Sequence, residues 1–211
     1  MKKTFLLLCL FLVSVSTSFA DDSYVSVKGG LFLPNSDMPG LKNFKKGYNF
    51  ELAVGAKIHP NIAIEAAAGY YQTEIKDNFV DTYYDYYNDA YYTTTPTVSA
   101  IPVTLTIKGI IPLGKVDLFA GAGAGYYYTM LENKVKDLDG AVLGNLDETY
   151  NASAFGYHFV GGVDFNITDS VAIGAEIKQV YVKPESDISG YKQKVNMGGT
   201  IANAGVKFKF N

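Results

Sequence analysis

Apolar and polar side chains alternate at every second position through most of the chain after residue 20. In the segment 48–58, Phe50 and Leu52 fall on one face of an extended chain. Asn49 and Glu51 fall on the other face, and this two-residue period is typical of a β-strand with two different surroundings. Eight segments follow the pattern, namely 24–33, 48–58, 62–73, 99–111, 116–130, 155–164, 171–178 and 203–210. The alternation therefore predicts an all-β protein with an even number of strands.

Short and long connections alternate strictly between these segments. The short connections are rich in turn residues and comprise 59–61, 112–115 and 166–169. The long connections are polar and comprise 34–46, 74–98, 131–152 and 184–196. In an up-and-down meander, this order places all short turns at one end and four long loops at the other. Outer-membrane barrels have this arrangement, with short periplasmic turns and longer extracellular loops.

The two faces of the strands differ in charge. The apolar face holds almost no charge, whereas the polar face carries Glu51, Lys57, Glu65, Lys108, Asp117, His158, Asp164, Glu176, Lys178, Lys207 and Lys209. A soluble barrel of the lipocalin type would turn its apolar face inward. A lysine turned into the middle of a bilayer costs about 2–4 kcal/mol, so the uncharged face is the one suited to lipid. We expect an eight-stranded antiparallel up-and-down transmembrane β-barrel with these polar groups inside it.

Side chains alone fill a barrel of eight strands. An unpaired buried charge is very costly, so we expect the inward acids and lysines to pair and to close the interior. The alternative is a narrow, porin-like path for ions or small solutes. The sequence leaves this alternative open.

The first twenty residues have the order of a secretory signal peptide. Lys2 and Lys3 precede an apolar run, 5–13, which is too short to span a membrane as a helix. A small-x-small motif ends at Ala20, after which we expect cleavage. The expected domains are a signal peptide, 1–20, and an outer-membrane barrel, 21–211.

Composition narrows the functional classes. The formal net charge is −3, and all 18 basic residues are Lys, which removes the cationic surface of a nucleic-acid-binding protein. One Cys and two His are too few for a disulfide framework or a Cys/His zinc site. We expect no cofactor and no metal.

Three segments resemble the small outer-membrane β-barrel family, which includes the outer membrane protein A, X and W types and the opacity proteins. The segments 55–65 and 162–176 are similar to its strand–turn–strand units. The segment 204–210 is similar to its C-terminal assembly signal, here with Phe208 and Phe210 followed by Asn211. The resemblance implies insertion into the outer membrane of a Gram-negative-type cell, with outer-membrane lipids and the barrel-assembly machinery as partners.

Some eight-stranded outer-membrane barrels are lipid-modifying enzymes, and His158 is the candidate base for such chemistry. A base of this kind needs a nucleophile and an orienting acid within reach. Ser153 lies nearby in the sequence but belongs to no recognisable motif. We therefore interpret His158 as a structural residue and predict no catalytic site.

The connection 74–98 is rich in tyrosine and aspartate, with the candidate contact residues Asp81, Tyr83, Tyr84, Asp85, Tyr86, Tyr87, Tyr91 and Tyr92. Tyrosine rings bury a large area at low entropic cost and make adaptable contact surfaces. The alternative is a solvated extension without a partner. We predict a non-enzymatic scaffold that presents four long extracellular loops, with adhesion to host or matrix surface components or envelope integrity as its use.

Overall fold

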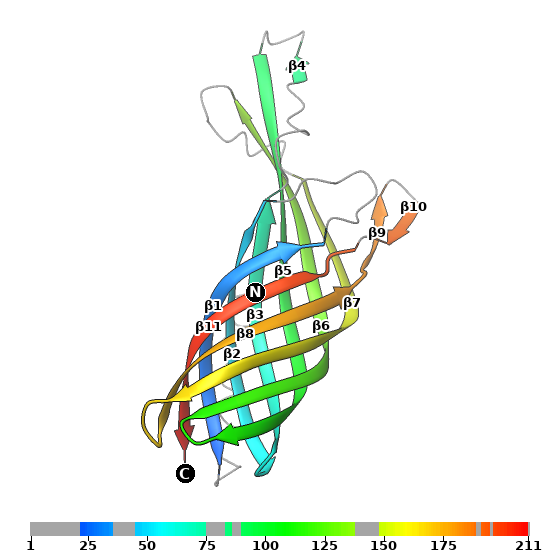
Figure 1. The fold of residues 1–211 in the computed structure, drawn as a ribbon. Helices are drawn as coiled ribbons and strands as arrows, with labels where there is room; N and C mark the ends of the chain where they lie inside the picture. The colour runs from blue at the N-terminus through cyan, green and yellow to red at the C-terminus, as the bar shows by residue number, and fades with distance from the viewer. Residues whose placement is uncertain are drawn as a thin grey trace.

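The computed structural model describes residues 22–35, 45–74, 83–85, 90–137, 148–188, 191–194 and 196–210. Eight long strands form the body of the protein (Figure 1): β1 (Ser23–Pro34), β2 (Gly47–His59), β3 (Ile62–Glu74), β5 (Ala90–Leu113), β6 (Val116–Asp137), β7 (Glu148–Asn166), β8 (Val171–Val182) and β11 (Gly199–Phe210). Three short strands are β4 (Tyr83–Asp85), β9 (Glu185–Ile188) and β10 (Tyr191–Lys194). Within the described ranges, no helix is long and apolar enough to cross a membrane.

The eight long strands close into an antiparallel barrel. Their order is β3-β2-β1-β11-β8-β7-β6-β5, and pairing of β3 with β5 completes the circle. The first and last strands pair along their whole length, from Ser23 opposite Phe210 to Pro34 opposite Gly199. Closure satisfies the backbone groups of every strand inside the bilayer, where no water is available to them. The predicted fold is confirmed.

Three tight turns join the strands at the end where the chain terminates (Figure 1). The β5–β6 turn contains Gly114 with φ of +72°, a conformation that favours glycine. In the β7–β8 turn, the backbone N–H of Val171 donates to the hydroxyl of Thr168 over 3.0 Å. The strand ends that the long connections join lie at the opposite end, in the order that the sequence predicts.

Three strands extend further than the sequence predicts. Residues 90–98, 131–137 and 148–152 belong to β5, β6 and β7 rather than to loops, and β5 with β4 projects well beyond the barrel (Figure 1). The missing signal has a physical cause. These segments are rich in polar residues and lack the apolar alternation, whereas Thr and Tyr still favour extended backbone.

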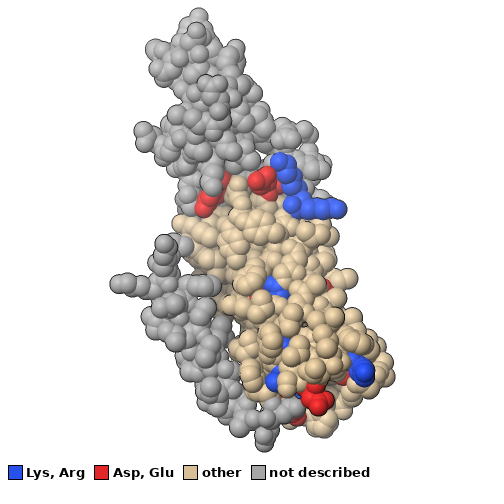
Figure 2. Space-filling view, turned by 90° about the vertical axis from the view of Figure 1, so that its left-hand side faces the viewer, with Lys and Arg blue, Asp and Glu red and all other residues tan. Residues whose placement is uncertain are grey.

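The outer face of the barrel is apolar. Large exposed side chains include Leu105, Ile107 and Ile177. Figure 2 shows that uncharged residues dominate the described surface between charged groups near its two ends. At the loop end, the hydroxyls of Tyr48 and Tyr70 both donate to Gln72 Oε1, at 2.7 and 2.6 Å. Such aromatic residues with a polar tip suit the edge of a bilayer.

Candidate functional site: the barrel interior

Lys28 is the centre of a buried ion-pair network. Its Nζ donates to Glu51 Oε1 and Glu65 Oε1, each over 2.9 Å, and to Glu176 Oε2 over 3.1 Å. These residues come from β1, β2, β3 and β8, and Lys28 is only 7% exposed. One ammonium group therefore joins four strands across the lumen.

Two further lysines balance the three glutamates. Lys108 Nζ lies 2.7 Å from Glu65 Oε2, and Lys178 forms an ion pair with Glu51. We call these six residues, Lys28, Glu51, Glu65, Lys108, Glu176 and Lys178, the central ion network. Its formal charges cancel, which is what allows ionised groups to remain inside a barrel.

A second polar group lies nearer the short turns. Lys207 pairs with Asp164, and Lys209 Nζ lies 3.9 Å from Asp117 Oδ2. Lys57 lines an open cavity at this mouth of the barrel, together with Lys209. The structure thus places ten of the eleven predicted interior residues in these two groups or at this mouth, and it buries His158 in the interior with a hydrogen bond to Thr106.

The interior also contains polar residues that the predicted set lacks. Lys28 lies on the polar face of β1. Because it is a single lysine in an otherwise uncharged strand, the sequence does not indicate that it pairs with three glutamates. Tyr24 donates from its hydroxyl to Glu65 Oε2 over 3.0 Å. Asn49 donates to Asn203 Oδ1 over 2.8 Å. Their shared parity along the strands is the only sequence signal that could have found them.

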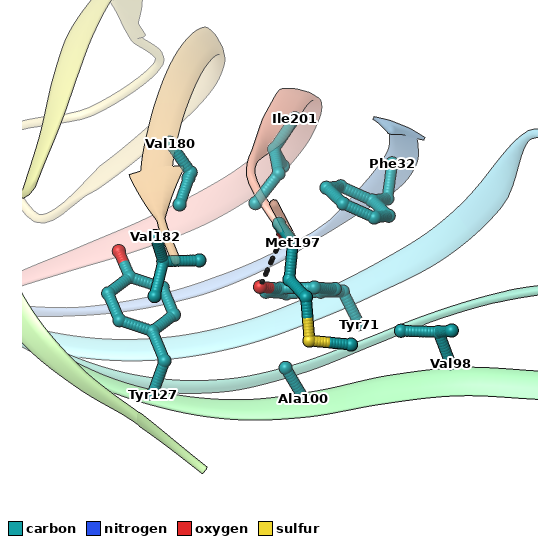
Figure 3. Close-up of a cluster of buried hydrophobic side chains, with 9 residues drawn as sticks. All are labelled: Phe32, Tyr71, Val98, Ala100, Tyr127, Val180, Val182, Met197 and Ile201. Carbon is teal, nitrogen blue, oxygen red and sulfur yellow. Dashed lines mark hydrogen bonds between the residues drawn. The ribbon is translucent and has the colours of Figure 1, made fainter. Parts of the chain in front are cut away.

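Closer to the loops, the lumen is filled by apolar side chains (Figure 3). We call this cluster the apolar layer, and its members are Phe32, Tyr71, Val98, Ala100, Tyr127, Val180, Val182, Met197 and Ile201. The sequence predicts the inward polar residues but not this apolar part of the interior. The eight members that lie in strands share the inward parity of the charges, but they are nearer the loop end of the barrel.

The apolar layer crosses the lumen. Met197 follows β10 outside any strand, and its backbone N–H donates to Val182 O over 3.0 Å. The hydroxyl of Tyr71 donates to Met197 O over 3.4 Å (Figure 3). Tyr71 is on β3 and Val182 on β8, which stand opposite each other in the strand order. Met197 therefore bridges two opposite strands of the barrel near the loop end of the lumen.

His158 and Ser153 are not brought together. His158 is fully buried, with Nε2 2.9 Å from the hydroxyl of Thr106. Ser153 is exposed and accepts a hydrogen bond from the Tyr126 hydroxyl over 2.6 Å. Five residues apart on β7, the two side chains leave opposite faces of the barrel wall. The described part of the chain holds no group of three or more His, Cys, Asp or Glu arranged for a metal ion.

The predicted contact residues fall partly in strands. Tyr83, Tyr84 and Asp85 form β4, and Tyr91 and Tyr92 belong to β5, with Tyr83 opposite Tyr92. This corrects their assignment to a loop, since Tyr and Thr favour extended backbone.

Three other contact residues, Asp81, Tyr86 and Tyr87, lie outside the described residues. At the other end of the barrel, Phe208 and Phe210 of β11 are 45% and 51% exposed on the outer face.

The outer membrane protein beta-barrel domain family matches residues 5–210 of the chain. Three solved structures are similar to it. Neisserial surface protein A is 17% identical with a TM-score of 0.54, covering 89% of this chain and 97% of that one. OprG from Pseudomonas aeruginosa is 14% identical with a TM-score of 0.57, covering 90% and 97%.

The third is a major outer membrane protein from Thermus thermophilus, 12% identical with a TM-score of 0.55, covering 89% and 99%. At these identities the likeness concerns the fold. No match was found among curated proteins.

Proposed function

Since the chain belongs to the outer membrane protein beta-barrel domain family and is an outer-membrane β-barrel, we propose that it is a non-enzymatic scaffold with a closed lumen. Its role is to present strands and loops outside the cell, for adhesion to host or matrix surface components or for envelope integrity. Its remaining partners are outer-membrane lipids and the barrel-assembly machinery.

The observation that carries the proposal is the filling of the lumen by two different layers. In the central ion network each charge has a partner, so an ion that entered would have to displace a buried pair. In the apolar layer an ion would lose its hydration without gaining any charged partner. Both barriers weigh against the alternative of a narrow channel.

The presenting role is supported by the strands that project from the barrel. β5 and β6 pair from Leu113 opposite Val116 as far as Tyr92 opposite Asp137, well past the last β3–β5 pair, Glu74 opposite Thr97. A paired extension holds its backbone in place, so a partner would not have to order it on binding.

The non-enzymatic part is supported by the positions of His158 and Ser153. Nucleophilic catalysis needs a base within hydrogen-bond reach of the nucleophile. Here the barrel wall separates the two side chains. His158→Ala should therefore leave any lipid-modifying activity of the purified protein unchanged, and a loss of such activity would contradict this part of the proposal.

Conductance tests the closed lumen. Protein refolded in detergent, with folding checked by heat-modifiable gel migration, is inserted into planar bilayers. We expect no stable openings under an applied voltage. Openings of one reproducible size would overturn the proposal and favour the channel.

Adherence of cells that display the protein tests the presenting role. A variant with Tyr83, Tyr84, Tyr91 and Tyr92 all changed to Ser removes the rings of the projecting strands. A control variant changes Thr93, Thr94 and Thr95 to Ser in the same strand and keeps every ring. We expect adherence to cultured cells to fall severalfold in the first variant only. Equal adherence of both variants would contradict a role of these four tyrosines in adherence.

A further inference from the structure

A small cavity inside the barrel lies between the central ion network and the group nearer the short turns. Its volume is about 20 Å³, and its lining includes Ser26, Lys28, Lys108, Asp164, Glu176 and Lys207. A cavity volume of roughly 10–15 Å³ is enough to hold one water molecule. The cavity can therefore take one species of about that size.

The hydroxyl of Ser26 has no hydrogen-bond partner among the described residues, although Ser26 is only 2% exposed. Buried polar atoms are almost always hydrogen-bonded, so an unpaired hydroxyl on a cavity wall indicates a bound species. A hydroxyl serves an anion as a donor. Ser26 is thus one candidate ligand.

Two ammonium groups on the same cavity keep donors to spare. Lys28 commits its Nζ to three carboxylates. Lys108 is within hydrogen-bond distance of one carboxylate, that of Glu65, and lies 3.8 Å from Glu176. Lys207 pairs with Asp164 alone among the described carboxylates. An ammonium group has three N–H donors, so both Lys108 and Lys207 can bind a further acceptor.

One aromatic ring links these two lysines. Lys108 Nζ lies 4.8 Å and Lys207 Nζ 5.6 Å from the centre of the Phe119 ring, which also lines the cavity. The ring restricts where the two ammonium groups can point. Lys207 Nζ also lies 4.6 Å from the centre of the Tyr24 ring, so both ammonium groups are held against aromatic rings at this end of the central ion network.

Two glycines line the cavity where β8 and β11 meet. Gly174 stands opposite Gly205, and both line the cavity. A Cβ at Gly174 would lie 2.3 Å from Asp164 Oδ1, and one at Gly205 would lie 3.0 Å from Lys28 Cγ. The two glycines make the room that the charged groups occupy.

We propose that this cavity binds one small monovalent anion, chloride in ordinary media, held by the Ser26 hydroxyl and the ammonium groups of Lys108 and Lys207. The choice of an anion follows from the donors, since the Ser26 hydroxyl and the spare N–H groups of Lys108 and Lys207 can all donate to a species in the cavity. The anion stabilises the junction between the two polar groups of the lumen. The site is independent of the proposed scaffold role, which conductance and adherence test separately.

Bromide is a probe of chloride sites that X-ray crystallography detects by anomalous scattering. Crystals of the full barrel grown in sodium bromide should show an anomalous peak in the cavity beside Ser26, Lys108 and Lys207. Density for water without any bromide signal would overturn the proposal.

Stability in solution tests the same site with a matched pair of variants. Sodium bromide replaces sodium gluconate at constant ionic strength while unfolding of the detergent-folded barrel is followed. Ser26→Ala should bind bromide about tenfold more weakly, since it loses a hydrogen bond to a charged group. Thr104→Val also removes a buried, unpaired hydroxyl, but Thr104 does not line this cavity, so it should respond as the wild type does. No bromide effect in the wild type, or an equal effect in Ser26→Ala, would refute the site.

Discussion

The central ion network and the apolar layer fill one lumen from the same strands by opposite chemistry. On β1, Lys28 belongs to the network and Phe32 to the apolar layer. On β8, Lys178 and Val180 are two residues apart and do the same. All four side chains point inward. Strand parity therefore determines which face of the wall a side chain takes, but not whether its surroundings in the lumen are charged or apolar.

The two layers also differ in how the loss of one side chain lowers their stability. In the network, removal of one partner leaves a buried charge uncompensated. In the apolar layer, truncation leaves a cavity whose cost depends on how far the neighbours relax. Substitutions at single positions can therefore distinguish the two.

The largest effect is expected at the hub of the network. Lys28→Met should lower the free energy of unfolding by about 3–5 kcal/mol, because three glutamates lose their shared cation. Urea titration of the barrel in lipid vesicles, read by circular dichroism, measures this. The matched control is Lys45→Met, since the Lys45–Glu74 pair is 41% and 47% exposed and such pairs contribute about 0–1 kcal/mol. Equal losses in both variants would mean that the network adds no more than a surface pair.

Met197→Ala in the apolar layer should cost about 2–5 kcal/mol, the range for truncation of a large buried side chain. Met130→Ala is its control, because Met130 is half-buried on the outward parity of β6 and leaves no cavity in the lumen. The same urea titration compares them. If Met197→Ala were no more destabilising than Met130→Ala, the segment 196–198 would not be part of the packed interior.

Tyr71→Phe is the smallest change and removes only the hydrogen bond across the lumen. A typical net value is about 0.5–1.5 kcal/mol. We expect the lower end of that range, because the hydroxyl lies 3.4 Å from Met197 O. Tyr127→Phe removes a buried hydroxyl that has no partner among the described residues, and it should be neutral or stabilising. The reverse order of the two variants would show that the bond to Met197 does not stabilise the layer.

The fold was accessible from the sequence because its causes are local. Alternation over ten or so residues, as in the segment 48–58, reports which face of a strand meets lipid. The order of short and long connections then specifies a meander. The projecting parts of β5 and β6 were missed, since their mostly polar residues show no apolar alternation although Thr and Tyr favour extended backbone.

The interior could be anticipated only as a set of inward positions. Lys28 and Glu176 are 148 positions apart in the chain, and their contact depends on the register of all the strands between them. The apolar layer, the bridge that Met197 makes between β3 and β8, and the cavity at Ser26 depend on the same registers and on the height of each residue along the barrel axis. A repeating pattern of two residues defines inside and outside, whereas which inward side chains meet depends on how the closed sheet is sheared, and that is a property of the whole chain.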